Sequence, residues 1–189
     1  MQLDIFDDSR DVMLRNDVLS AMQHHDAVVA RNALQVLTHE YPDDAALMAL
    51  DTLVTALEAR CNRPFESHDA ALDARETLLS RVHPSACDQM GERRAIVWLA
   101  PFWNELAQRA ARLPFRTGQP DAHAAALYLH AGNWQAADAA ILRIESWRRI
   151  PAPLMWQTVC RYRLEGLEAA WPLLAELAWV APKLLDVLI

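Results

Sequence analysis

The chain has 189 residues, of which 53% are hydrophobic and 23% charged, and its formal net charge at pH 7 is -7. This composition is typical of a folded domain, and the negative charge argues against direct nucleic-acid binding. Only four residues are glycine, too few for glycine-rich phosphate loops and tight β-hairpins, which need positive φ angles.

Helix signals follow one another along the chain, separated by short turns with proline, aspartate or glycine. Capping residues and apolar periodicity predict helices at 10–24, 27–40, 45–60, 68–82, 121–131, 134–148, 152–164, 167–180 and from 182 onward. His83-Pro84 is expected to end the fourth helix. Residues 86–112 form a long helical stretch that Pro101 should kink or split. Residues 113–120 are the longest predicted loop.

Alanine and leucine dominate the composition, which favours an all-α fold. Short links force consecutive helices to lie antiparallel, so the expected unit is a helical hairpin. We predict a right-handed stack of such hairpins, an α-solenoid of about ten helices. It would form a single domain at residues 9–189, preceded by a tail or cap at residues 1–8.

The C-terminal run LLAELAWVAPKLLDVLI continues its apolar pattern to the last residue. A terminal repeat should present a polar outer face to water. We therefore expect the chain to be a piece of a longer protein. The alternative is an end that packs on a partner or on its own copy.

Three segments have a similar spacing of small, apolar and proline residues, and two of them match only its second half. The segment 121–151 places them at Ala125, Tyr128, Gly132, Trp134, Ala137, Ile141 and Pro151. The other two place them at Asp26, Ala30, Leu34 and Pro42, and at Ala170, Leu174 and Pro182. This pattern resembles the tetratricopeptide repeat over about half of the chain. Two departures are Arg161, where the family usually has an aromatic, and residues 60–112, which fit no repeat cleanly.

The resemblance implies protein or peptide binding, often in a concave groove. It also implies that the repeat positions pack helices together and perform no chemistry. The first hypothesis is therefore a non-enzymatic scaffold or adaptor module that recognises a protein or a peptide.

No residue pattern in the chain points to catalysis, a cofactor or a metal. The cysteines Cys61, Cys87 and Cys160 are far apart and form no CxxC pair, so we expect reduced and mostly buried thiols. His24-His25-Asp26 is interpreted as a turn with a capping aspartate.

The acidic N-terminus does not resemble a secretory signal, and no apolar run is long enough for a membrane span, so we expect a cytoplasmic protein without a membrane partner.

Charge is distributed unevenly along the chain. Residues 1–60 carry 11 acidic residues and 4 arginines, whereas residues 90–163 carry 10 arginines and 5 acidic residues. The arginines proposed as a surface for an anionic partner are Arg109, Arg112, Arg116, Arg143, Arg148 and Arg149. Interleaved tryptophans could help this surface bind an acidic peptide or stack on exposed bases. The alternative is that the tryptophans lie in the core and the arginines form an ordinary solvent-exposed surface.

The N-terminal motif consists of Gln2, Leu3, Asp4, Ile5 and Phe6. QLDIF resembles the short peptide that binds the bacterial DNA sliding clamp. An extended tail of this kind could place its apolar side chains in a groove of the clamp, with the glutamine as an orienting hydrogen-bond partner. This is the second functional hypothesis, a replication- or repair-associated adaptor tethered to the clamp. The alternative is a structural cap, in which the apolar side chains fold back onto the first hairpin.

Overall fold

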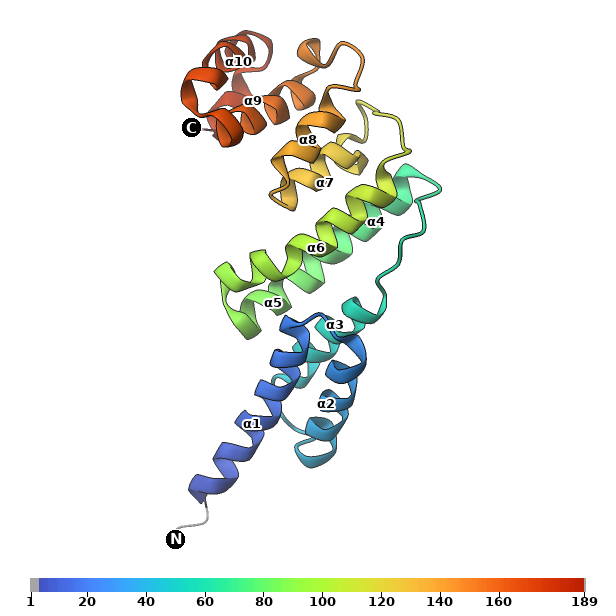
Figure 1. The fold of residues 1–189 in the computed structure, drawn as a ribbon, viewed down its shortest axis with the longest axis vertical. Helices are drawn as coiled ribbons and strands as arrows, with labels where there is room; N and C mark the ends of the chain where they lie inside the picture. Colours follow the sequence, from blue (N-terminus) through green and yellow to red (C-terminus); the bar gives the residue numbers. More distant parts are fainter. Residues whose placement is uncertain (1–3, 189) are drawn as a thin grey trace. The chain divides into compact units, whose positions relative to one another are not determined.

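The computed structural model describes the backbone of residues 4–188 and the side chains of residues 10–186 (Figure 1). Within that part of the chain, every regular element is helical. Consecutive helices pack against one another as antiparallel pairs. The chain divides into two compact units, Met1–Cys61 with Glu76–Leu99, and Asn62–Arg75 with Ala100–Ile189.

The first unit begins with three consecutive helices. They are α1 (Asp4–Gln23), α2 (Ala27–Glu40) and α3 (Leu47–Glu58). Val18, Leu37 and Leu50 are completely buried in this unit. Asp26 caps α2 by accepting a hydrogen bond from the backbone N–H of Val29, 3.0 Å away.

Charged side chains join these helices at their edges. Arg15 of α1 pairs with Asp44 across 2.7 Å. Arg31 of α2 pairs with both Asp51 and Glu58 of α3, at 2.6 and 2.7 Å. The acidic residues of the first 60 positions are thus partly committed to ion pairs within the unit.

The first helix starts earlier than the sequence predicts. It begins at Asp4 and not at residue 10, so part of the expected tail or cap at residues 1–8 belongs to the backbone of α1. Negative side chains are favourable in the first turn of a helix because they face its positive dipole end.

The expectation that His83-Pro84 ends a helix is wrong. Helix α4 (His68–Thr77) runs through a π-helical turn at Leu78–Val82 into α5 (His83–Met90). The backbone N–H of His83 donates to the carbonyl of Leu78, the wider spacing of a π-helix. Pro84 then falls in the first turn of α5, directly after the π-helical turn.

The long stretch 86–112 is divided at Gly91, and Pro101 does not divide it. Gly91 has a φ of +78°, a conformation that glycine adopts readily and that ends α5. Pro101 lies inside the single helix α6 (Glu92–Ala110).

The second unit ends in five consecutive helices. They are α7 (Ala124–His130), α8 (Trp134–Ile141), α9 (Pro151–Glu165), α10 (Leu167–Val180) and α11 (Pro182–Leu188). Helix α8 is shorter than predicted, because the backbone leaves the helix after Ile141 and reaches a left-handed conformation at Ser146. A 3-10 turn at Trp147–Arg149 then leads into α9.

Small side chains form the contact between α7 and α8. Ala125 and Ala137 are completely buried and belong to one apolar cluster with Ile141 and Trp156. Alanine brings the helix backbones close together, and the larger side chains fill the remaining space. A second cluster joins α9 and α10 through Leu154, Leu173 and Leu177.

In the part of the chain that the structure describes, no helix combines the length and apolar character needed to cross a lipid bilayer.

Candidate functional site

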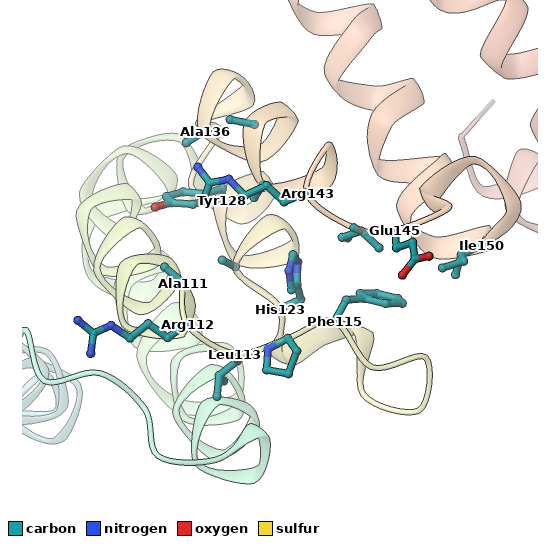
Figure 2. Close-up of a pocket in the computed structure, with 15 residues that line it drawn as sticks. Ala111, Arg112, Leu113, Phe115, His123, Tyr128, Ala136, Arg143, Glu145 and Ile150 are labelled. Carbon is teal, nitrogen blue, oxygen red and sulfur yellow. The ribbon is translucent and has the colours of Figure 1, made fainter.

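A groove of about 730 Å³ opens in the second unit (Figure 2). Its walls come from the segment after α6, from α7 and α8, and from the approach to α9. The small residues of α8, Ala136, Ala139 and Ala140, form part of its lining and leave the space open. The groove therefore depends on the two consecutive helices α7 and α8 and on the two connections that flank them.

Aromatic rings lie at and behind the floor of the groove. Phe115 meets His123 edge to face at a centroid distance of 5.7 Å and Trp156 in the same way at 6.1 Å. The rings of His123 and Trp156 are nearly parallel at 6.4 Å. The neighbouring His68 is buried and lies with its Nε2 2.7 Å from the carbonyl oxygen of Pro114. These contacts fix the 114–115 segment beneath the groove.

His123 is a buried, neutral member of this floor. Its Nδ1 accepts a hydrogen bond from the backbone N–H of Ala125 and caps α7, so the ring proton resides on Nε2. Burial lowers the pKa of His123 to about 4, and the nearby His68 adds to the effect. At neutral pH the floor of the groove is therefore uncharged.

Charged side chains occupy the rim. Arg112, Arg143 and Glu145 are exposed and line the groove. In Figure 2, Tyr128 and Arg143 lie on one side of the hollow, and Phe115 and Glu145 on the other, while Arg112 extends outward. Among the described side chains, none forms a hydrogen bond or ion pair with Arg143. An unneutralised guanidinium beside an apolar floor is suited to a carboxylate ligand.

The structure places the other predicted arginines elsewhere. Arg109 lies 4.0 Å over the ring of Phe65 and donates to the carbonyl of Arg63. Arg148 pairs with Glu176 at 3.0 Å. The last two, Arg116 and Arg149, are exposed and do not line the groove. Of the proposed anionic-partner surface, Arg112 and Arg143 alone lie at this groove.

The predicted repeat positions divide between the core and the surface. The buried ones are Ala30, Leu34, Ala125, Ala137, Ile141 and Ala170. The half-buried ones are Tyr128, Trp134 and Leu174, and Pro42 and Pro182 are exposed. Gly132 has a φ of +68°, and a Cβ added there would lie 3.8 Å from the Trp134 ring. Of this set, only Tyr128 lines the groove.

Sequence reasoning missed Phe115, His123 and Ile150 as groove residues. They lie in a loop or at helix ends, where periodicity carries no signal. The one sequence signal was Phe115 itself, since an aromatic side chain in a predicted loop usually packs against a neighbouring helix.

The N-terminal motif lies only partly within the residues that the structure describes. Gln2 and Leu3 fall outside the described residues. Asp4, Ile5 and Phe6 belong to the start of the α1 backbone, and their side chains are not described. The choice between a clamp ligand and a structural cap therefore stays a prediction.

Among the described residues, no group of three or more histidine, cysteine, aspartate or glutamate side chains could hold a metal ion.

Comparison with known proteins found no matching family model, no matching curated protein and no matching solved structure.

Proposed function

We propose that this chain is a non-enzymatic adaptor module that binds an acidic peptide segment of a partner protein in the groove beside Arg143. The observation that carries the proposal is the combination of an open, apolar-floored groove with an arginine that no described side chain neutralises. A volume of about 730 Å³ falls within the range of about 300–1,000 Å³ typical of small ligand sites. It suits a few residues of an extended peptide.

The charges of the rim suggest a direction of recognition. A carboxylate of the peptide would bind the guanidinium of Arg143, and Tyr128 lines the same groove. Glu145 disfavours a second carboxylate at the opposite side. The preferred ligand is therefore an apolar segment with an acidic residue at one end.

Binding suits this groove better than catalysis does. His123 is the buried ionisable group of its floor, and its Nδ1 already caps α7. Its lowered pKa has a structural cause, burial among aromatic rings. A structural histidine of this kind needs no catalytic role to account for its pKa.

The architecture supports the same function. We propose that the stacked hairpins form a solenoid similar to tetratricopeptide repeats, with α7 and α8 as its most regular hairpin. The support is the buried alanine on each helix, Ala125 and Ala137, and the turn at Gly132 with positive φ.

A peptide-display selection tests the proposal. A random peptide library is selected against the intact chain, and against Arg143→Glu and Arg149→Glu variants. We expect acidic, apolar peptides to be enriched by the intact chain and by Arg149→Glu, and to be lost with Arg143→Glu. Enrichment that is the same for all three proteins would contradict the groove as the site.

A second candidate function rests on the residues QLDIF at positions 2–6. We propose that this segment tethers the module to the DNA sliding clamp, which would place it near replication or repair. The test is retention of purified bacterial clamp by the immobilised chain and by a Leu3→Ala/Phe6→Ala variant. Equal retention by both proteins, or none by either, would reject the tether and leave the structural cap.

A further inference from the structure

Helix α10 carries a row of exposed apolar side chains along its outer face. Trp171 is 66% exposed, Trp179 is 90% exposed and Leu167 is 56% exposed. With the exposed Ala175, these residues are spaced four apart and form one ridge of the helix. We call Leu167, Trp171, Ala175 and Trp179 the tryptophan ridge. None of them lines the groove beside Arg143.

The opposite side of α10 is packed against other helices of its own unit. Leu173 and Leu177 are buried against Leu154 of α9, and Figure 1 shows α9 and α10 side by side. Glu176 is paired with Arg148. The tryptophan ridge is therefore additional to the surface that the fold itself uses. Two tryptophans exposed to this degree are unusual, because a tryptophan side chain typically buries about 150–250 Å² of apolar surface.

The spacing of the ridge is self-complementary. If two copies of α10 lie antiparallel about a twofold axis at Ala175, Trp171 of one copy meets Trp179 of the other. The small Ala175 side chain lies at the crossing, where helix backbones approach most closely. A twofold interface requires one surface to fit its own copy in this way.

The charges at the two ends fit the same arrangement. Glu168 lies beside the N-terminal end of the ridge, and Lys183 follows its C-terminal end in α11. Both side chains are exposed. The antiparallel arrangement brings Glu168 of one copy toward Lys183 of the other, twice in the dimer. A parallel arrangement would place each residue beside its own copy, so that Glu168 would meet Glu168 and like charges would repel.

We propose that the tryptophan ridge is a homodimer interface, whose occupant is the α10 ridge of a second copy of this chain. The exposed area of two tryptophans and a leucine from each copy approaches the total of about 1,000 Å² that a specific interface needs. An interface at this low end of the size range is typical of reversible association, so we expect monomer and dimer to exchange.

Sedimentation equilibrium of the intact chain, from about 1 to 100 µM, tests this interface. We expect a reversible monomer–dimer equilibrium for the intact chain and a monomer at every concentration for Trp179→Glu. Met48→Glu is the matched control, since Met48 is an exposed apolar residue of α3, 83% exposed, and it should dimerise as the intact chain does. Circular dichroism verifies that each variant keeps its helical content.

A charge exchange tests the antiparallel register. Glu168→Lys alone and Lys183→Glu alone should each weaken dimerisation several-fold, because each creates like-charged pairs across the twofold axis. The double variant Glu168→Lys/Lys183→Glu should recover the affinity of the intact chain. A double variant that is weaker than both single variants would overturn the register. A monomeric intact chain, or undiminished dimerisation of Trp179→Glu, would overturn the interface.

Discussion

At the scale of single residues, His123 connects the stability of the protein to its groove. The same ring caps α7, stacks on Trp156 and forms part of the groove floor. The helix cap needs the neutral ring, because Nδ1 must accept a hydrogen bond from the backbone N–H of Ala125. Protonation would place a buried charge beside His68 and remove the acceptor that Ala125 uses.

The lowered pKa of His123 predicts a loss of stability in mild acid. The ordinary pKa of 6.5 applies to the unfolded chain and the value of about 4 to the folded one, so the unfolded chain binds more protons between these values. The contribution of His123 is fully present above pH 6.5 and is lost as the pH falls toward 4. Over that window the free energy of unfolding should decrease by about 3 kcal/mol from this group.

Urea unfolding at a series of pH values measures this effect. His123→Asn retains a side-chain oxygen that can cap α7 but has no proton to gain. We expect a shallower pH dependence in the variant between pH 6.5 and 4. Equal slopes for the two proteins would show that His123 does not titrate in this window.

The cysteines provide a second residue-scale prediction. Burial raises the pKa of the Cys160 thiol to about 12, whereas Cys61 is exposed. The sequence-based expectation of mostly buried thiols therefore holds for Cys160 but not for Cys61. Iodoacetamide at pH 8 should alkylate Cys61 in the native protein and Cys160 only after unfolding. Peptide mass spectrometry measures both, and rapid native labelling of Cys160 would contradict its burial.

Some residues of the groove could be predicted from sequence, and others could not. The excess of arginine in residues 90–163 indicated a basic surface, and Arg112 and Arg143 do line the groove. The composition does not show which arginines bind side chains of the same chain, as Arg109 and Arg148 do. That distinction depends on side chains brought close only by folding.

At the scale of helices, the breaks were harder to predict than the helices themselves. Proline was taken as the stronger signal, yet Pro84 lies in a first turn and Pro101 inside α6. Gly91 ends α5 through its positive φ, which a sequence does not display. Periodicity identifies a helix from many residues, whereas a helix end depends on one or two.

The role of Gly91 leads to a prediction about stability. Its φ of +78° and ψ of 154° are unfavourable for any residue with a Cβ. Gly91→Ala should lower the free energy of unfolding by about 1–3 kcal/mol, a conformational cost, since no heavy atom lies within 4 Å of the added Cβ.

Gly118→Ala is the matched control. Gly118 also has open space around it and lies outside the left-handed region, so the change should be neutral or slightly stabilising. Urea unfolding of both variants measures the difference. If both substitutions have the same effect, the conformation at Gly91 does not explain the break between α5 and α6.

At the scale of the whole molecule, the succession of helical pairs could be predicted from sequence. Apolar periodicity and short turns indicated an all-α chain with antiparallel neighbours, and the structure confirms it. The division into two compact units was not visible, because two of its three boundaries fall within α4 and α6, where the sequence shows no linker. The groove was not visible either, because residues 111–115 and 150 approach α7 and α8 only after folding.

The central claim is that the groove beside Arg143 binds an acidic peptide. Fluorescence anisotropy of a labelled, display-selected peptide measures its affinity for the intact chain, Arg143→Glu and Arg149→Glu. A charge-assisted hydrogen bond contributes about 1.5–3 kcal/mol, so Arg143→Glu should weaken binding at least about tenfold. Arg149→Glu has the same change of charge outside the groove and should alter binding by less than about threefold. Equal losses in the two variants would show that only the general positive charge of this region attracts the peptide, which contradicts a built site.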